Sequence, residues 1–188
     1  GKIDFVGNKA LGDRAVLRAM KNLHPIGFPH SIFLESLFPK TFDATKLEED
    51  KERIRMAYTS QGYFLARVTD SKVEMKDSGG GRLMFPPFTK TKPGKAAFLT
   101  LNIDEGRLYR LNQINFVGVK LFRTPEVLMR PLFGMGQGDV FSTEKLSKGF
   151  KNLQKYYGEF GFIDAVPEPE FNPLPDGKID LTINVDEG

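Results

Sequence analysis

The sequence repeats three motifs in the same order, and this duplication limits its possible folds more than any other feature. The matched pairs, first copy before second, are 3–9 (IDFVGNK) with 114–120 (INFVGVK), 61–66 (QGYFLA) with 160–165 (FGFIDA), and 101–106 (LNIDEG) with 183–188 (INVDEG). One matched pair could arise by chance, but three in order indicate an internal repeat. The chain is therefore predicted to contain two copies of one structural unit.

The spacing of the motifs places the domain boundary and locates two insertions. The offset between the copies falls from 111 to 99 to 82 residues along the chain. The first copy therefore carries about 12 extra residues before Phe42 and about 17 more between its last two motifs. We predict one domain at 1–106 with two insertions and a compact domain at 107–188.

Each copy begins with the pattern of a strand followed by two helices. Apolar and polar residues alternate at 2–6 and at 111–117, which is typical of half-buried strands. The first helix is expected to begin at Asp13 in one copy and at Thr124-Pro125-Glu126 in the other, with threonine as N-cap. The second helix is expected to begin at Asp43 and at Ser142.

The second helix shows an apolar face that both copies share. Its predicted buried residues are Leu47, Ile54 and Tyr58 in the first copy, matched by Leu146, Leu153 and Tyr157 in the second. Gly62 and Gly161 lie just beyond the helix ends, where a left-handed residue is favoured.

The last strand of each copy has one apolar and one polar face, which indicates a sheet covered by helices on one side. Its apolar residues are Leu99, Leu101 and Ile103 in the first copy, and Ile179, Leu181, Ile183 and Val185 in the second. The predicted fold class is α+β: two tandem β-α-α-β-β domains, each a three-stranded mixed sheet with two helices on one face.

Several functional classes are disfavoured by what the sequence contains. With 27 basic and 24 acidic residues the net charge is only +3, without the basic excess of a nucleic-acid-binding domain. No apolar run approaches the roughly 18–20 residues of a membrane span. There is no cysteine, and His24 and His30 fit no metal-binding spacing. No serine lies in a Gly-x-Ser-x-Gly motif, so we expect no catalytic site, cofactor or metal.

The glycine- and proline-rich stretch at 77–97 is interpreted as a flexible insertion between strands. It contains three consecutive glycines at 79–81, but not the spacing of a phosphate-binding loop. Its lysines are expected to be solvated, although they could also contact an anionic partner.

The order of these motifs resembles the POTRA (polypeptide-transport-associated) domain. The Phe-Val-Gly-Asn start at 5–8, the glycine-aromatic steps at 62–64 and 161–163, and the Asp-Glu-Gly ends carry the resemblance over the whole chain. Asp-Glu-Gly followed by Tyr109-Arg110-Leu111 is similar to the junctions between neighbouring domains in the BamA family.

The resemblance implies a non-enzymatic module in the periplasm, held at the outer membrane by a β-barrel that this sequence does not include. It also implies partners: unfolded outer-membrane proteins, accessory lipoproteins and the protein's own barrel. Three other functions stay open, namely the paired POTRA region of a two-partner secretion transporter, a structural domain of an envelope or division complex, and a cytosolic enzyme.

The family's sheet order, first–third–second, makes the second strand of each copy an open edge that could accept an extended peptide by β-augmentation. The second copy protects this edge with Pro167, Glu168, Pro169 and Glu170, whereas 65–75 contains no proline. The expected peptide-binding residues are Leu65, Arg67, Val68, Thr69, Ser71 and Val73. A solvated edge with no ligand is the alternative interpretation.

A change of alternation along this strand predicts a β-bulge. The inward-facing residues change parity from Phe64, Ala66 and Val68 to Val73 and Met75, which places a bulge near 70–72.

The other insertion holds an apolar cluster. It is interpreted either as an extended helix packed on the core or as an exposed partner surface. Its residues are Ile32, Phe33, Leu34, Leu37 and Phe38.

Overall fold

The computed structural model describes residues 2–23, 44–78, 94–162 and 165–187. Its internal contacts divide the chain into two compact units. The first comprises Gly1–Arg55 and Arg67–Asp104, and the second comprises Met56–Ala66 and Glu105–Gly188.

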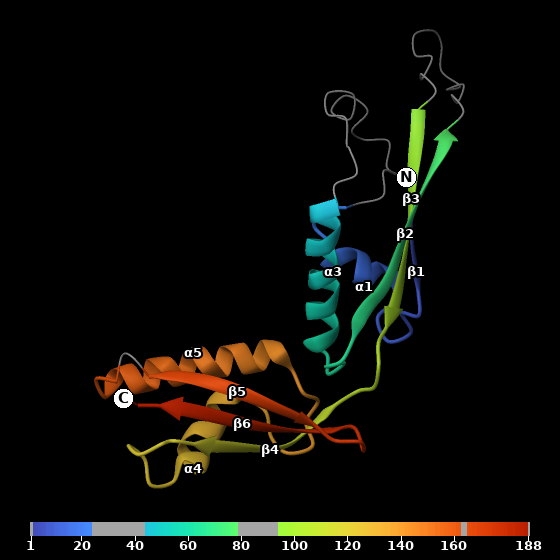
Figure 1. The fold of residues 1–188 in the computed structure, drawn as a ribbon. Coiled ribbons are helices and arrows are strands. Elements are labelled where there is room, and N and C mark those ends of the chain that lie inside the picture. The colour runs from blue at the N-terminus through green and yellow to red at the C-terminus, as the bar shows by residue number, and fades with distance from the viewer. Residues whose placement is uncertain (1, 24–43, 79–93, 163–164, 188) are drawn as a thin grey trace. The chain divides into compact units, whose positions relative to one another are not determined.

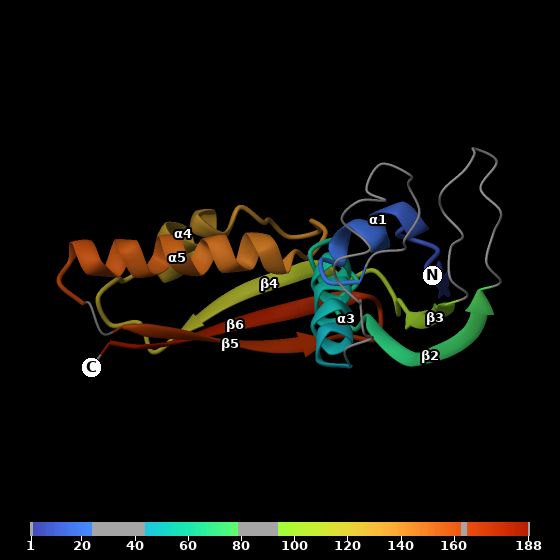
Figure 2. The ribbon, with the colours of Figure 1, turned by 90° about the horizontal axis from the view of Figure 1, so that it is seen from above.

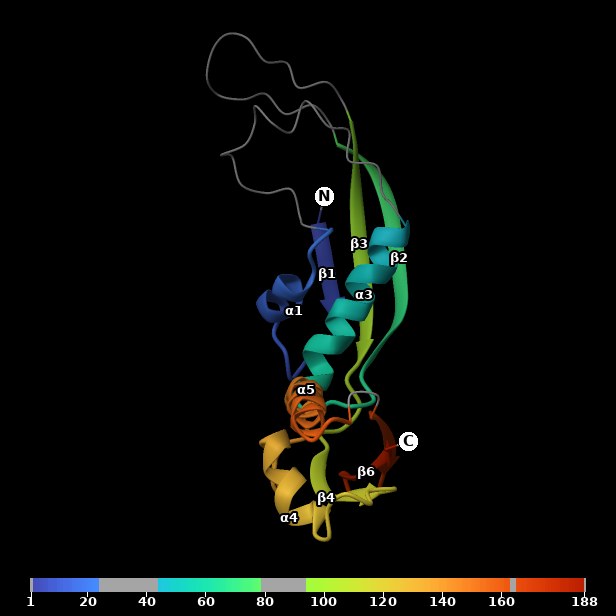
Figure 3. The same ribbon diagram turned by 90° about the vertical axis from the view of Figure 1, so that its left-hand side faces the viewer.

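The first unit has helices on one face of a three-stranded sheet (Figure 1). Its elements are β1 (Lys2–Val6), α1 (Asp13–Ala19), α3 (Ala44–Thr59), β2 (Arg67–Ser78) and β3 (Gly94–Asp104). The sheet order is β1-β3-β2, with β1 parallel and β2 antiparallel to β3. The long β2 and β3 run side by side (Figure 3).

The second unit repeats this architecture, with its helices on one side of the sheet (Figure 2). Its elements are β4 (Arg110–Val117), α4 (Pro125–Met129), the 3₁₀ turn η1 (Arg130–Phe133), α5 (Thr143–Glu159), β5 (Val166–Pro173) and β6 (Lys178–Asp186). The order β4-β6-β5 matches that of the first sheet. The predicted fold class and sheet order are confirmed.

The predicted apolar faces form the cores. Leu47, Ile54 and Tyr58 of α3 are each at most 5% exposed, as are Leu146, Leu153 and Tyr157 of α5. Every apolar residue predicted for the last strands is also buried. α1 begins at Asp13, as predicted. Thr124 and Ser142 occupy the predicted N-cap positions, but of the two only the Ser142 hydroxyl accepts a capping hydrogen bond, from the N–H of Lys145 at 3.4 Å. Asp43 lies outside the described residues.

The glycine of the Phe-Val-Gly motif is required by a close approach between two strand ends. Gly7 and Gly118 have φ angles of +93° and +83°. A Cβ atom would lie 2.2 Å from the carbonyl oxygen of Ile103 at the first site and 2.3 Å from that of Val185 at the second. The first motif of each copy therefore fits directly against the third.

The glutamate of the Asp-Glu-Gly motif anchors the end of the last strand to the second helix. The Tyr58 hydroxyl donates to Glu105 Oε1 at 2.9 Å, and the Tyr157 hydroxyl donates to Glu187 Oε1 at 2.8 Å. Burial, together with this carboxylate, raises the pKa of both tyrosines, which therefore stay protonated. Glu187 also accepts hydrogen bonds from the backbone N–H groups of Lys120 and Leu121.

The strands flanking the second insertion extend further than the sequence suggested. The β2–β3 ladder continues to the pair Ser78 and Gly94, so both ends of the predicted loop at 77–97 are strand. The glycines and prolines of 77–97 suggested a loop, but a strand ladder depends on backbone pairing and not on the side chains. Residues 79–93 lie outside the described ranges.

Candidate functional site

The open edge of the first sheet is formed by β2, which at 12 residues is the longest strand in the described parts of the chain. It pairs with β3 on one side only, and no described strand pairs with its other side. An edge of this kind presents backbone N–H and C=O groups that an extended peptide can bond.

A β-bulge interrupts the strand near its start. The register shifts between Val68 and Asp70, which leaves Thr69 as the additional residue. The Thr69 hydroxyl lies 3.3 Å from the carbonyl oxygen of Asn102 and donates to it across the bulge. The bulge was predicted near 70–72 and lies at Thr69, just before that range. Inward-facing positions begin again at Ser71, opposite Leu101, and not at Lys72.

The hydrogen bonding of Ser71 indicates which donors face outward. Its backbone N–H donates to the Asp70 carboxylate at 2.7 Å and therefore does not point toward β3. Because N–H direction alternates at period two, the N–H groups of Val73 and Met75 also face the open side. Val73 is half-buried, whereas Met75 is 56% exposed despite its predicted inward position.

Alternating charges line the outer face of the strand. Glu74 forms ion pairs with Lys72 at 2.7 Å and with Lys76 at 3.2 Å. Hydrogen bonds from these lysines lower the pKa of the Glu74 carboxyl. The Lys76 ammonium also lies 5.1 Å from the centre of the Phe98 ring on β3. Charged side chains on an edge discourage indiscriminate pairing between sheets without removing the backbone donors.

The equivalent edge of the second unit has lost most of its outward donors. Pro167, Pro169 and Pro173 share one parity in β5, and the ladder with β6 is unbroken from Val166 to Pro173. Since proline has no N–H, the N–H groups that bond to β6 must belong to the residues that alternate with the prolines. The proline positions therefore face the open side of the strand. Of that parity only Phe171 retains an open-side N–H.

The register aligns the two edges residue by residue. Ser71 lies opposite Leu101, just as Pro169 lies opposite the equivalent Ile183. Met75 lies opposite Ala97, as Pro173 lies opposite Ile179. The first unit thus keeps N–H groups at positions where the second has proline.

Most of the predicted edge residues lie in β2, namely Arg67, Val68, Thr69, Ser71 and Val73. Leu65 does not, because it precedes the strand in the segment 56–66 that belongs to the second unit. Phe64 was wrongly assigned to the inward face of this strand. Its ring packs against Phe141 and Phe171, with centroids 5.5 and 5.0 Å apart.

Sequence reasoning missed two features of the edge. One is the outward N–H of Met75, which the alternation of the strand could have indicated. The other is the Asp70 carboxylate, which accepts the Ser71 N–H. The apolar cluster formed by Ile32, Phe33, Leu34, Leu37 and Phe38 lies outside the described residues.

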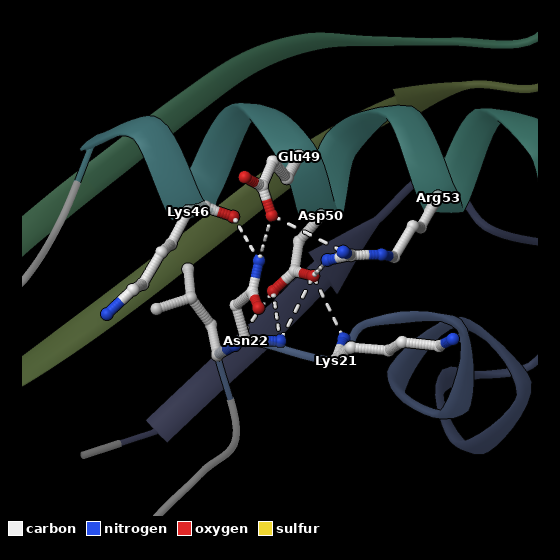
Figure 4. A network of polar contacts seen from close by, with 7 residues as sticks. Lys21, Asn22, Lys46, Glu49, Asp50 and Arg53 are labelled. Atoms are coloured by element: carbon white, nitrogen blue, oxygen red, sulfur yellow. Dashed lines mark hydrogen bonds and ion pairs between the residues drawn. The ribbon is translucent and has the colours of Figure 1, made fainter.

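A second polar site surrounds the Asp50 carboxylate of α3, which is fully buried (Figure 4). Its oxygens accept hydrogen bonds from the backbone N–H groups of Lys21, Asn22 and Leu23 at 2.7–3.2 Å. Arg53 adds an ion pair at 2.8 Å. Burial alone would raise the pKa of Asp50, but these four donors outweigh it and hold the pKa below its ordinary value.

This network is structural, because both oxygens of the carboxylate already accept hydrogen bonds from the segment that follows α1. Elsewhere in the described ranges, no three His, Cys, Asp or Glu side chains are grouped so that they could hold a metal ion. Among the same residues, no helix has the length and apolar character needed to cross a bilayer.

Two α+β repeats, each with helices on one face and an edge strand on the sheet, define a tandem-repeat protein. The family model for POTRA, described as surface antigen variable number repeat, matches residues 1–106 and 109–188. The chain belongs to the POTRA family, and its resemblance to the POTRA domains of BamA is confirmed.

The curated relatives are outer membrane protein assembly factors named BamA. That of Neisseria meningitidis serogroup B is 21% identical over 189 residues, covering 99% of this chain and 21% of the relative. That of Buchnera aphidicola is 21% identical over 152 residues, covering 80% of this chain and 22% of the relative. The chain thus spans about a fifth of these proteins.

A solved structure of similar fold is that of Haemophilus influenzae BamA POTRA3-5. It has a TM-score of 0.67 and 21% identity, and the match covers 100% of this chain and 65% of that one. The structure of Haemophilus ducreyi BamA lacking POTRA domains 1-3 has a TM-score of 0.51 and 19% identity. That match covers 79% of this chain and 24% of the other.

Proposed function

We propose that this chain is a non-enzymatic periplasmic module of an outer-membrane β-barrel assembly factor, and that β2 binds extended segments of client polypeptides. In this proposal it is tethered through a membrane barrel and also docks accessory lipoproteins. The observation that carries the client-binding role is the contrast between outward N–H groups at Ser71, Val73 and Met75 and prolines at matching positions of β5.

Backbone pairing suits a receptor for many different sequences. A peptide aligned on β2 bonds to main-chain groups, so affinity depends little on its side chains. Each such bond contributes about 0.5–1.5 kcal/mol net, and ordering of the peptide offsets part of the total. Binding is therefore expected to be weak, with Kd on the order of millimolar, which allows a client to be released onward.

Proline at the positions of β2 that match the prolines of β5 should remove the outward N–H groups that a peptide would bond. Ser71→Pro combined with Met75→Pro removes two outward N–H groups and leaves the ladder donors in place. We expect at least tenfold weaker binding of a peptide copied from an outer-membrane β-strand, measured by NMR titration.

The matched control is Ser71→Ala with Met75→Ala, which keeps both N–H groups and should bind as the unmodified protein does. A proline variant that remains folded by circular dichroism and binds peptide with unchanged affinity would contradict the proposed edge.

Removing the Asp70 carboxylate should strengthen binding, because this side chain occupies the Ser71 N–H that a peptide needs. Asp70→Ala frees that donor, and we expect affinity to rise about two- to fivefold, in line with one exposed hydrogen bond. Asp4→Ala removes a carboxylate from β1 of the same sheet and serves as control. Equal peptide affinities of the unmodified protein, Asp70→Ala and Asp4→Ala would show that the Asp70 carboxylate does not compete for the Ser71 N–H.

A further inference from the structure

A small cavity lies beside β4, the strand at the other edge of the second sheet. It has a volume of about 190 Å³. It is lined by residues 111–114 of β4, by Arg130 at the end of α4, and by Met135 and Gln137 of the loop that follows η1. α4 itself runs beside β4 (Figure 1). Sites for drug-sized ligands measure about 300–1,000 Å³, so this cavity suits a single small group.

The loop after η1 closes one side of the cavity and is held in place by hydrogen bonds. The N–H of Gly138 donates to the Leu111 carbonyl at 2.7 Å, and the N–H of Leu111 donates to the Asp139 carbonyl at 2.8 Å. The N–H of Gly136 donates to the Asp139 carboxylate at 2.8 Å. Among the described residues, no hydrogen bond joins this loop to 112–114. The cavity is therefore preformed, and it begins where the cover of β4 ends.

A β-bulge interrupts β4 at the cavity. The register with β6 shifts between Leu111 and Gln113, which leaves Asn112 as the additional residue. The side-chain amide of Asn112 donates to the Asp180 carboxylate at 2.7 Å. Bulges are frequent next to binding sites, because they redirect the groups that follow them. Here the residue that follows in the core is Ile114.

The prolines of β5 fix the direction in which the Ile114 backbone groups point. Ile179 and Ile183 of β6 lie opposite prolines, so by alternation Leu181 between them also directs its N–H and C=O groups toward β4. Leu181 is aligned with Ile114. In a parallel pair its hydrogen bonds reach the two residues that flank Ile114. The N–H and C=O groups of Ile114 therefore point away from β6, to the side of the cavity.

These two backbone groups are buried without a protein partner. Ile114 is 1% exposed. No described residue bonds to its N–H or C=O on the cavity side. A buried N–H that lacks a partner is unfavourable, so such a site retains ordered water or takes up a ligand that accepts the hydrogen bond. The wall of the cavity thus contains an unused donor.

Arg130 supplies the cavity with a positive charge. It is exposed, and it forms no hydrogen bond or ion pair with another described residue. The carboxylates of Asp139 and Asp180 instead accept hydrogen bonds from Gly136 and Asn112. A guanidinium presents two parallel donors that match the two oxygens of a carboxylate. One guanidinium balances one negative charge, which favours a carboxylate over a doubly charged phosphate.

We infer that this cavity binds a carboxylate group, which pairs with Arg130 and accepts a hydrogen bond from the Ile114 N–H. The carboxylate belongs to an acidic side chain of a partner or to a small free acid, because the volume leaves room for little more. The site lies on β4, and it does not depend on peptide binding at β2.

Titration of the chain with propionate, followed by NMR at the Ile114 amide and the Arg130 Nε–H, tests the inference. Propionate carries the carboxylate of a glutamate side chain, and propionamide is its neutral counterpart of nearly equal size. At constant ionic strength we expect saturable shifts at both groups with propionate, and binding about fivefold or more weaker with propionamide. Equal responses to the two compounds, or tighter binding of inorganic phosphate, would overturn the inference.

Substitution of Arg130 tests its part in the site. Arg130→Gln should weaken propionate binding about fivefold or more, since the charge is lost. Arg130→Lys keeps the charge without the two parallel donors, and its affinity should lie between the two. Arg123→Gln alters another exposed arginine of the same unit and should bind propionate as the natural protein does. Unchanged affinity in a folded Arg130→Gln protein would contradict the inference.

A second ligand distinguishes the two sources of the carboxylate. The α-amide of N-acetylglutamate presents the same propionate group on a peptide backbone, and its side chain carries its only charge. Tighter binding of this compound than of propionate would support the site and assign it to an acidic side chain of a partner. Tighter binding of propionate would support the site and assign it to a free acid.

Discussion

Asp50→Asn is expected to destabilise the first unit by about 3–5 kcal/mol, the usual consequence of removing one partner from a buried ionic network. The amide has nearly the size of the carboxylate, but its nitrogen would face backbone donors that now bond to Asp50 oxygens (Figure 4). With total stabilities near 5–15 kcal/mol, this loss is a large share of what holds a unit together. Hydrogen exchange of buried amides such as Val16 and Leu101 measures it.

The matched control is Glu52→Gln on the same helix. Glu52 pairs with Arg55, but both side chains are 47% exposed, so we expect a loss below about 1 kcal/mol. If the two variants have equal stabilities, Asp50 does not organise the segment after α1.

The same carboxylate should give the first unit a characteristic response to acid. Because the folded pKa of Asp50 is lowered, its contribution is complete above the unfolded value of about 3.9. It is lost as the pH falls below that value and through the folded pKa. The stability difference between the natural protein and Asp50→Asn should therefore shrink from pH 5 toward pH 2, and a constant difference would contradict this origin.

Gly118→Ala is the other substitution with a large expected effect, about 3 kcal/mol or more on the second unit. A left-handed φ costs an L-residue about 1–2 kcal/mol, and the new Cβ would lie 2.3 Å from the Val185 carbonyl oxygen, which belongs to the central strand. The strand end would have to move. Urea unfolding followed through second-unit amides measures the loss.

Gly138→Ala separates conformational strain from the clash. Its φ is +85°, yet a Cβ atom there would meet nothing within 4 Å among the described residues. We expect a loss of about 1–2 kcal/mol. Similar losses for both variants would mean that the close approach to Val185 is unimportant.

The repeat and the alternation patterns were sufficient to predict the architecture. Buried residues such as Leu101, Ile183 and Tyr157 can be predicted from their spacing. Packing on one side imposes a period of two on a strand and of 3.6 on a helix. The sheet order came from the resemblance to POTRA domains. The position of Phe64 could not be predicted, because a local pattern does not reveal which unit an aromatic side chain will join.

The candidate edge was predictable in outline but not in its hydrogen bonding. Pro167, Pro169 and the glutamates beside them indicated a closed edge in the second copy, whereas the part of Pro173 emerged only from the register of β5. The outward direction of the Ser71 N–H depends on where the bulge falls, and a one-residue shift reverses every donor. The role of Asp50 was also hidden, since its backbone donors are about 28 residues away.

The most direct test of the account is an amide NMR titration of the chain with a peptide copied from an outer-membrane β-strand. We expect shifts concentrated on Ser71, Val73 and Met75, little change along β5, and loss of the response in the Ser71→Pro, Met75→Pro protein. Shifts of equal size along both edges, or none at millimolar peptide, would contradict client binding at β2.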